Sequence, residues 1–326
     1  MRIYRSLSEV PPDFGPSAVS IGNFDGVHFG HRRILCRVKE LADQNGWKAS
    51  VLTFDPHPTR VVAPDRTPPL LTSPDRRAAL MGEAGIEQVL ILPFTRELAA
   101  LSPEEFAQRL LVDALGARAV LVGDNFHFGH KQAGNVAVLA DLGRRLGFAT
   151  EIVSAVKWRG RVVSSSVVRQ LIRAGDMGLA ARMLQHAYGL EGEVVSGRGV
   201  GSKQTVPTLN LKTVAEVIPA NGVYITCTRD LESAREWNSV TNIGYRPTFG
   251  ASDELTIETF LLDALTGEPP RRIRVEFLRR LRAERKFETP DALRAQILKD
   301  VRTAHTWCRR VAAWTGMWTD PACISC

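Results

Sequence analysis

The chain has 326 residues, of which 44% are hydrophobic and 24% charged, and its formal net charge is +7. At about 150 residues per domain this length predicts two domains, and the composition is ordinary for a globular protein with a real core. No uninterrupted apolar run reaches the roughly 18 residues of a membrane span, residues 1–15 lack the apolar segment of a secretory signal, and basic residues are dense only at 271–286, so we expect neither a membrane nor a nucleic acid as a partner.

The first half of the chain alternates candidate strands with candidate helices. Apolar runs predict strands at 18–22, 49–54, 88–94, 119–123 and 149–156. Helical patterns between them cover 31–42, 102–116 and 135–147. The second of these helices opens with a capping box of Ser102 and Glu105 around Pro103. The alternation predicts an α/β fold with a doubly wound parallel sheet, and continuous apolar strands indicate that helices cover both of its faces.

A glycine-rich segment with two histidines follows the first predicted strand. In the sequence GNFDGVHFGH, His28 and His31 stand among glycines where the first helix begins. The free N–H groups of a helix N-terminus favour phosphate, glycines let the backbone approach a ligand closely, and both histidines can donate hydrogen bonds to phosphate oxygens. The motif alone leaves a second interpretation open, namely two surface histidines at a helix start. Neither the G-x-G-x-x-G fingerprint nor a Walker P-loop is present.

Three further polar segments follow other predicted strands. Asp55 and His57 come after the second strand, the segment 122–135 with Asn125 comes after the fourth, and the serine-rich segment 162–172 comes after the fifth. Ligands of an open parallel sheet bind at the carboxyl ends of its strands. Four such segments at one edge therefore predict a binding site, and the positive net charge favours a phosphorylated ligand there.

From about residue 188 the pattern changes to short, often alternating segments separated by turn residues. These segments lie at 191–197, 222–229, 239–245, 255–262 and 272–278. In the last of them Ile273, Val275 and Phe277 share one face. The spacing predicts an all-β barrel or sandwich.

One helix closes this half, with Leu293, Ile297 and Val301 on one face. We expect the boundary between the halves near 185–192. The expected organisation is a domain over 1–187, a domain over 188–312 and an unassigned tail over 313–326.

The cysteines indicate the redox state of the cellular compartment in which the protein works. Their number is odd and their spacing irregular, which favours a reducing cytoplasm over a disulfide framework. The five are Cys36, Cys227, Cys308, Cys323 and Cys326. The CxxC at 323–326 lacks the second pair that a zinc site needs, so we interpret it as part of a solvated tail.

The motifs of the first half together resemble a known family. H-x-G-H after the first strand with SSSVVR after the fifth is similar to the cytidylyltransferase-like nucleotidyltransferases, which have a Rossmann-like fold. GNFDGVHFGH, FDPHP, VGDNFHFG and SSSVVR resemble, over about residues 1–187, the adenylyltransferase module of the bacterial bifunctional riboflavin kinase/FAD synthetases. The resemblance implies that the phosphate of FMN attacks the α-phosphate of ATP, which yields FAD and pyrophosphate.

The same resemblance implies roles for individual residues of this module. The implied ATP site consists of Gly22, Asn23, Phe24, His28, His31, Ser165, Ser166 and Arg169. The residues implied to act in catalysis are His28, His31 and Arg169, with Arg169 as a bidentate fork on the departing phosphates. The residues implied to contact the flavin are Asp55, His57 and Asn125. The resemblance departs at His127, where the family commonly has arginine.

Residues from about 188 to 310 resemble the riboflavin kinase module of the same family. That module is a small Greek-key β-barrel that transfers the γ-phosphate of ATP to riboflavin, which yields FMN and ADP. In VPTLNL, Thr208 and Asn210 are implied to bind ATP and Mg²⁺, for which their oxygens are suitably hard ligands. Asn242 in NIGYRPTFG and Arg282 are implied to bind the flavin, and no tightly bound cofactor is implied.

Glu258 in LTIETFLL is implied to be the catalytic base of this second module. It shares a strand face with Phe260 and Leu262. We expect burial on that apolar face, which would raise the pKa of the carboxyl towards a value useful for accepting a hydroxyl proton. The residue type alone leaves a strand-edge glutamate that faces water as the second interpretation.

The second module departs from the family at several positions. Ser202, Thr205 and Val206 stand in a segment where the family typically has Arg, Gly and Phe, and Phe260 replaces the usual His. The leading interpretation is a two-site enzyme that makes FMN and then FAD. A monofunctional FMN adenylyltransferase with an inactive flavin-binding barrel is the first alternative. A flavin- or RNA-binding regulator is the second, against which the intact phosphate-transfer motifs argue.

Overall fold

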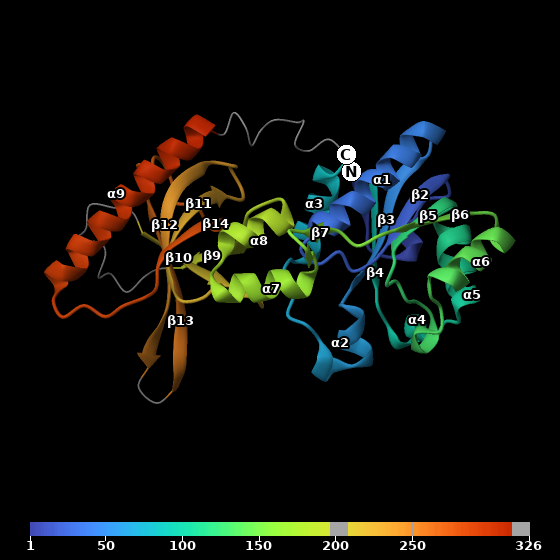
Figure 1. The fold of residues 1–326 in the computed structure, drawn as a ribbon, viewed down its shortest axis with the longest axis horizontal. Helices are drawn as coiled ribbons and strands as arrows, with labels where there is room; N and C mark the ends of the chain where they lie inside the picture. Colours follow the sequence, from blue (N-terminus) through green and yellow to red (C-terminus); the bar gives the residue numbers. More distant parts are fainter. Residues whose placement is uncertain (196–207, 249–250, 315–326) are drawn as a thin grey trace. The chain divides into compact units, whose positions relative to one another are not determined.

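The computed structural model describes residues 1–195, 208–248 and 251–314 (Figure 1). The chain divides into two compact units, residues 1–165 and residues 166–325. The boundary expected near 187 stays a prediction, and the first barrel strand starts at Tyr188. The two compact units divide earlier in the sequence, after Ser165. The two helices that come before this strand belong to the second unit.

The first unit is built on a six-stranded sheet in which all neighbouring strands are parallel, with the order β1-β4-β3-β2-β5-β6. The strands are β1 (Arg2–Tyr4), β2 (Ser17–Ile21), β3 (Lys48–Asp55), β4 (Gln88–Pro93), β5 (Ala117–Gly123) and β6 (Ala149–Val153). The five predicted strands and the doubly wound parallel sheet are confirmed. The sequence analysis did not predict β1, which pairs with β4, nor the short hairpin of β7 (Lys157–Trp158) and β8 (Arg161–Val162).

Helices cover both faces of this sheet, as the apolar strands predicted. The longer ones are α1 (Phe29–Asn45), α3 (Pro74–Glu83) and α6 (Val136–Leu146). The short ones are α2 (Pro58–Val62), α4 (Arg96–Ala99), α5 (Pro103–Phe106) and the 3-10 turns η1 (Leu7–Glu9), η2 (Pro64–Arg66) and η4 (His130–Gln132). One core cluster packs α1 and α3 against the sheet, with Leu35, Leu80 and Val51 among its buried members. The other packs α5, α6 and the π-helical segment η3 (Ala107–Ala114) against the opposite face.

The predicted capping box at the start of α5 is confirmed. The Ser102 hydroxyl accepts the Glu105 N–H at 3.1 Å, and the Glu105 carboxylate accepts the Ser102 N–H at 2.8 Å. A regular α-helix was expected to run through residue 116. The chain instead continues from α5 as the π-helical segment η3, which ends at Ala114.

The strand order sets where a ligand can bind. From β2 the chain adds β3 and then β4 on one side, and it returns to place β5 on the other side of β2. This reversal makes the carboxyl ends of β2 and β5 the topological switch point, which is where open α/β sheets bind their ligands. The His28 segment follows β2 and the Asn125 segment follows β5.

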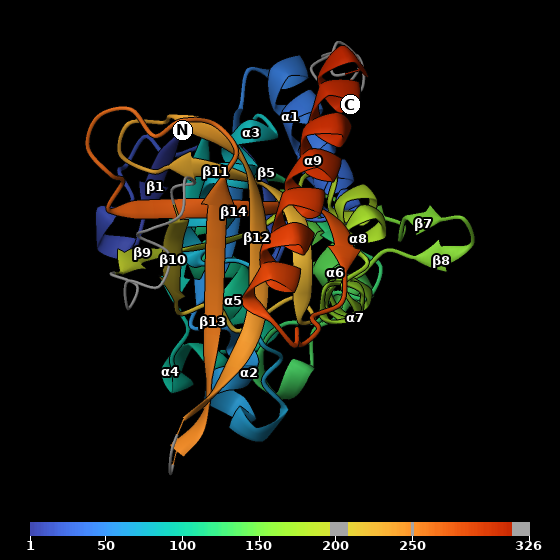
Figure 2. The ribbon, with the colours of Figure 1, turned by 90° about the vertical axis from the view of Figure 1, so that its left-hand side faces the viewer.

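The second unit contains a closed antiparallel barrel with the order β10-β13-β12-β11-β14-β9 (Figure 2). Its strands are β9 (Tyr188–Val195), β10 (Thr208–Thr213), β11 (Gly222–Asp230), β12 (Glu236–Thr248), β13 (Ala251–Leu261) and β14 (Arg272–Arg282). Its helices are α7 (Ser165–Ala174), α8 (Met177–Leu184) and α9 (Pro290–Trp314). The predicted barrel and closing helix are confirmed, whereas β10 was not predicted as a strand.

The interior of the barrel is partly polar. Five fully buried hydroxyl side chains form hydrogen bonds of 2.8 to 3.0 Å with one another: Thr226, Thr228, Ser239, Thr241 and Thr259. The apolar residues that alternate with them on β11 and β12, including Val223, Ile225 and Val240, pack outside the barrel with Ala304 of α9. Helix α9 therefore packs on the outer face of the barrel wall at these residues.

Helix α9 packs differently from the expectation. Leu293 is 41% exposed, and the contacts with the barrel are made further along by Ala304, Trp307 and Cys308. The helical periodicity was correct, but the first turns of the helix extend beyond the apolar part of the barrel wall.

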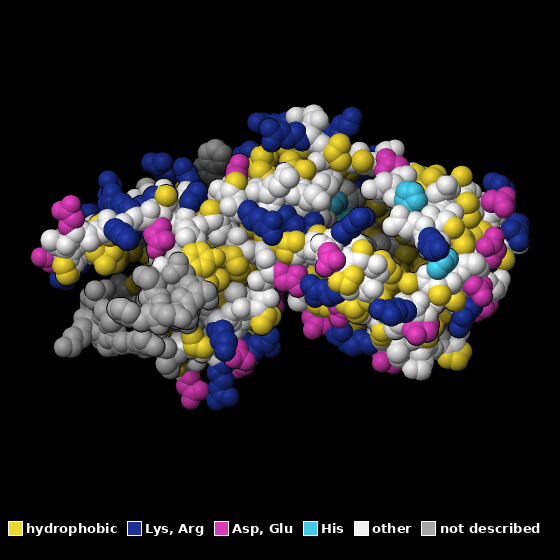
Figure 3. All heavy atoms as spheres, turned by 90° about the horizontal axis from the view of Figure 1, so that it is seen from below, with side chains coloured by type: hydrophobic (Ala, Val, Ile, Leu, Met, Phe, Trp, Pro, Cys, Tyr) yellow, Lys and Arg dark blue, Asp and Glu magenta, His cyan; other side chains and the backbone are white. Residues whose placement is uncertain are grey.

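The surface charges and the hydropathy of the helices bear on the partners that the sequence leads us to expect. Basic and acidic side chains are interspersed on the face that Figure 3 shows. No helix in the described part of the chain is long and apolar enough to cross a membrane.

Candidate active sites

The loop between β2 and α1 presents two stacked histidines at a helix N-terminus. His28 is the N-cap of α1, and its Nδ1 accepts the backbone N–H of His31 at 3.3 Å. The two rings stack with centroids 3.6 Å apart and planes 14° apart. His28 is buried, and the edge of the Phe24 ring meets His31 at 5.1 Å. His28 is thus buried as the cap of α1, His31 is partly exposed, and the role of the pair in phosphate binding stays a prediction.

The hydrogen bond of His28 fixes where its ring carries a proton. Because Nδ1 accepts, the neutral ring carries its proton on Nε2. His31 lies beside it in a buried setting, and burial, the charge of His28 and the charge of Arg77 all hold the pKa of His31 well below 6.5. A neutral His31 can still donate one ring N–H, and together with the N–H groups of the helix start it favours an anion such as phosphate.

The loop backbone is held in an unusual conformation. Phe24 and Val27 have positive φ angles of 49° and 39°, and Gly26 has 80°. For the two non-glycine residues this left-handed conformation costs of order 1–3 kcal/mol each, and such residues concentrate at functional sites. A Cβ at Gly30 would lie 3.2 Å from the His28 ring, so glycine there permits the close packing of the pair.

Buried polar contacts compensate for that strain, and the sequence analysis missed them. The Asp25 carboxylate accepts the N–H of Leu71 at 3.0 Å and that of Thr72 at 3.1 Å. The Ser165 hydroxyl donates to the Asp25 carbonyl at 2.9 Å. Arg77 donates to the carbonyl of Asn23 at 2.6 Å. The signal that could have found Arg77 is a charged residue in the otherwise apolar inner stripe of α3.

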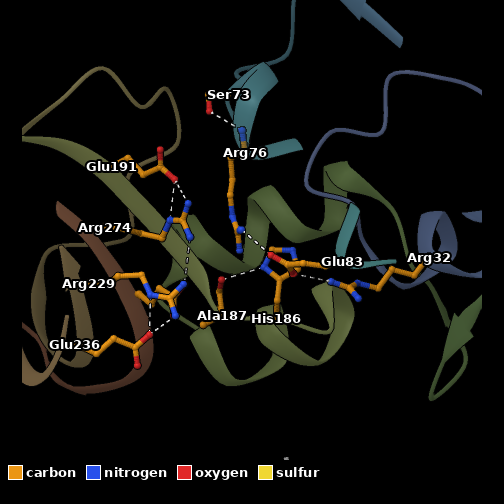
Figure 4. A network of polar contacts seen from close by, with 11 residues as sticks. Arg32, Ser73, Arg76, Glu83, His186, Ala187, Glu191, Arg229, Glu236 and Arg274 are labelled. Atoms are coloured by element: carbon orange, nitrogen blue, oxygen red, sulfur yellow. Dashed lines mark hydrogen bonds and ion pairs between the residues drawn. The ribbon is translucent and has the colours of Figure 1, made fainter. Parts of the chain in front are cut away.

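An ion-pair cluster ties α1 to α3. Glu83 of α3 lies 3.7 Å from Arg32 of α1 and 2.9 Å from Arg76 (Figure 4). Arg32 adjoins His31 in sequence, and Arg76 adjoins Arg77.

Other predicted residues of the first unit lie at the same edge of the sheet. Asp55 ends β3 and is exposed. His57 is buried as the N-cap of α2, and its Nδ1 lies 2.6 Å from the Thr59 hydroxyl. Asn125 is exposed in the turn after β5, where its carbonyl lies 3.0 Å from Nδ1 of His127. The sheet brings these side chains to its carboxyl edge, and their contact with a flavin stays a prediction.

The serine-rich motif is divided between the two units. Ser165 belongs to the first unit and anchors the loop through Asp25. Ser166 and the buried Arg169 lie on α7 of the second unit. Their binding of ATP stays a prediction.

The predicted residues of the barrel form one row across its wall. Asn210 of β10 pairs in register with Glu258 of β13, and Glu258 pairs with Asn242 of β12. On the next two strands the row continues through Val223 to Arg282. Because these residues alternate with buried interior ones, all five lie on the outer face. Residues far apart in sequence thus form one surface with amide, carboxylate and guanidinium groups.

Glu258 is less buried than the sequence analysis expected. Its strand β13 is paired on both sides, by β10 and β12, so it is not an edge strand. Phe260 shares its outer face, as predicted, and pairs with Thr208 of β10. The side chain of Glu258 is nevertheless partly exposed, because only part of the outer face is covered. Glu258 is therefore half-buried on the outer face, and its role as the base stays a prediction.

Arg282 makes a strong contact within the protein. Its Nε and Nη2 donate to one carboxylate oxygen of Asp300 on α9, at 2.9 and 2.8 Å. The other oxygen of Asp300, which is buried, accepts from Gln296 at 2.7 Å. Arg282 therefore connects α9 to the barrel, and its predicted contact with flavin would be made by the part of the guanidinium that faces away from Asp300.

Replacing Asp300 with alanine is expected to destabilise the second unit by about 1–3 kcal/mol, because it leaves a largely buried guanidinium without its carboxylate. Urea unfolding followed by circular dichroism measures the change. Lys299→Ala, an exposed neighbour on the same helix, is the control and should leave the unfolding midpoint in place. Equal midpoints for both variants would show that the pair contributes nothing to the docking of α9.

The donor set of the barrel row fits Mg²⁺. Thr208 and Asn210 stand two residues apart on β10, so they share its outer face, and Glu258 pairs with Asn210. Side-chain oxygens are the ligands that Mg²⁺ prefers, together with water and substrate phosphates. Among the described residues no group of three or more His, Cys, Asp or Glu could hold a metal ion alone, so a metal here would depend on the phosphates of a bound nucleotide.

Two predicted features lie outside the described residues. These are the segment with Ser202, Thr205 and Val206 and the C-terminal CxxC at 323–326.

Comparisons with known proteins match each unit separately. The family model described as FAD synthetase matches residues 11–167, and the one described as riboflavin kinase matches residues 184–308. The chain is 36% identical to the bifunctional riboflavin kinase/FMN adenylyltransferase of Pseudomonas fluorescens over 93% of this chain and 97% of that protein. It is 33% identical to the protein of the same description from Escherichia coli strain K12, over 93% and 96%.

A solved structure shares the fold over nearly the whole chain. The crystal structure of a macrolide-efflux protein from Streptococcus pneumoniae superposes with a TM-score of 0.82 and covers 94% of this chain and 99% of that chain. The identity is 23%, so this likeness concerns the fold alone.

Proposed function

The chain belongs to the bifunctional riboflavin kinase/FMN adenylyltransferase family, and we propose that its two reactions are divided between the His28–His31 loop and the outer face of the barrel. The chain phosphorylates riboflavin to FMN and adenylylates FMN to FAD, with ATP as the co-substrate of both reactions. The observation that supports the division is that each family model covers one of the two clusters.

In the proposed adenylyl transfer, a phosphate oxygen of FMN attacks the α-phosphorus of ATP. The new P–O bond forms as the bond to the bridging oxygen breaks, and pyrophosphate leaves. This chemistry needs positioning and charge stabilisation rather than a covalent nucleophile. His28 and His31 supply ring N–H donors, the start of α1 supplies backbone N–H groups, and Arg169 with Ser166 holds the departing phosphates.

Other residues of the loop have positioning roles in this proposal. Gly22, Asn23 and Phe24 line the nucleotide side of the loop, and Asn125 orients a phosphate from the neighbouring strand end. The Ser165 hydroxyl already donates its proton to Asp25, so it positions the loop rather than donating to ATP.

In the proposed kinase reaction, the Glu258 carboxylate accepts the proton of the riboflavin 5′-hydroxyl. The hydroxyl oxygen then bonds to the γ-phosphorus of ATP, and ADP leaves. Asn242 and Arg282 orient the flavin from the same row, while Thr208 and Asn210 would hold Mg²⁺. When bound, this ion neutralises charge on the phosphates.

No observation favours the monofunctional alternative or the regulator. The cytoplasm, where ATP is available, is the compartment we propose for both reactions.

A direct assay tests the proposed function. Purified protein is incubated with ATP and Mg²⁺, once with riboflavin and once with FMN, and the flavins are separated by chromatography. We expect FMN and FAD from riboflavin and FAD from FMN, with EDTA stopping the kinase step. FAD from FMN with riboflavin untouched would remove the kinase half of the proposal.

A further inference from the structure

Arg77 is a buried arginine in the first unit that no motif assigns. It lies in α3 and is 1% exposed, beside the core residues Ala78 and Met81. Burying a guanidinium costs free energy unless its partners compensate fully. Its neighbour Arg76 instead forms an ion pair with Glu83, so the helix presents one arginine outward and one into the core.

The hydrogen bonds of Arg77 do not explain its burial. Nη1 donates to the Asn23 carbonyl at 2.6 Å and lies 3.4 Å from the Thr53 hydroxyl. Nε is buried without a partner in the described part of the chain. A side chain that costs stability and meets a strained loop at its first turn is typical of a functional site.

The surroundings of Arg77 connect it electrostatically to the histidine pair. Burial lowers the pKa of Arg77, and the carboxylates of Asp25 and Asp55 oppose that shift, so the guanidinium keeps its charge at neutral pH. The groups that act on His31 besides its burial are His28 and Arg77, and both disfavour its protonation.

We propose that Arg77 is a positioning residue of the adenylyl-transfer site, which holds the 22–28 loop through the Asn23 carbonyl and brings a buried positive charge to the histidine pair. The role of Arg77 in adenylyl transfer rests on the proposed function, whereas its contact with the Asn23 carbonyl does not. The positive charge matters because the two histidine rings stack at 3.6 Å and would repel one another if both were protonated. Protonation of His28 at Nδ1 would also break the cap that this nitrogen gives to the His31 N–H.

Two substitutions separate the charge of Arg77 from its shape. Arg77→Met removes the positive charge, so the pKa of His31 should rise towards its ordinary value. The acidic limb of the pH profile of kcat/KM for FAD formation should then move to higher pH. Arg77→Lys keeps the charge but loses the planar fork, so it should leave the limb in place and lower the rate. A loop displaced by about 1 Å can cost about 100-fold in rate, and we expect a loss of this order in Arg77→Met.

The titration of His31 is also measured without activity. Imidazole NMR of the full chain gives its pKa in the unmodified protein and in each variant, with His31→Gln to assign the signal. Arg76→Met is the matched control on the same helix and should change neither the titration nor FAD formation. Urea unfolding followed by circular dichroism reports whether each variant is folded.

A higher pKa of His31 in Arg77→Met, but not in Arg77→Lys, together with slower FAD formation in both, supports the proposal. An unchanged titration in Arg77→Met, or FAD formation at the unmodified rate, overturns it. If Arg77→Met does not fold, full FAD formation by Arg77→Lys overturns the positioning role. Failure of the proposed function looks different, because His31→Gln would then form FAD at the unmodified rate.

Discussion

Replacing His28 with alanine is expected to abolish FAD formation from FMN and to leave FMN formation from riboflavin intact. The substitution removes the Nε2–H donor, the ring that stacks on His31 and the acceptor that caps α1. Loss of one donor that stabilises developing charge costs about 100- to 1,000-fold in rate, and the loss of the stack displaces a second donor. Chromatography of the flavins, from FMN with ATP and from riboflavin with ATP, measures both activities.

Two further variants separate the loss of the His28 ring from a general loss of stability. His28→Asn keeps an oxygen that can cap the His31 N–H, so it should restore thermal stability without restoring the rate. His130→Ala removes an exposed histidine of the same unit and should change neither activity. FAD formation by His28→Ala at the unmodified rate would place adenylyl transfer elsewhere.

The strands and the histidine motif could be predicted from the sequence because their signals are local. Apolar runs located β2 to β6, and the glycine–histidine spacing located the loop. The groups that hold this loop could not be found in that way. Thr72 lies 46 residues from Gly26, and Arg77 lies 54 residues from Asn23, so only the packing of α3 brings them together.

The barrel illustrates a different limit of sequence reasoning. Alternation located most strands, but it does not say which face is inside. The inner set on β11 and β12 includes hydroxyl residues such as Thr226 and Thr241, whereas Val223 and Ile225 lie outside. The usual rule of apolar residues inside would reverse the two faces. Val223 and Ile225 can lie on the outer face because α9 covers them there. This helix starts 60 or more residues after β11, so the pattern of β11 alone does not reveal the cover.

The row on the barrel wall could be predicted in its members but not in its arrangement. Asn210, Asn242 and Glu258 belong to three strands, and their alignment depends on the register of each pair. Register on the neighbouring strands is shifted by irregularities between Val223 and Tyr224, which no periodicity reveals. The structure therefore adds the information that the predicted base has an asparagine on each side.

Replacing Glu258 with glutamine is expected to abolish FMN formation from riboflavin and to leave FAD formation from FMN intact. The amide has the same shape as the carboxylate, and the strand pairing with Asn210 and Asn242 is made by the backbone, so the row should keep its register. It cannot accept the proton of the 5′-hydroxyl, and loss of a general base costs about 100- to 10,000-fold in rate. The kinase rate is measured from the appearance of FMN, and adenylyl transfer is measured on FMN supplied directly.

The control for Glu258 is Glu268→Gln, which neutralises an exposed carboxylate of the same unit and should leave both rates unchanged. Equal losses in both variants would mean that net charge, rather than the base, governs the rate. Loss of both activities by a folded Glu258→Gln protein would contradict the division of the reactions between two sites. Two independent sites on one chain require that Glu258→Gln loses the kinase activity alone and that His28→Ala loses adenylyl transfer alone. The reason is that neither substitution changes a group that the other reaction uses.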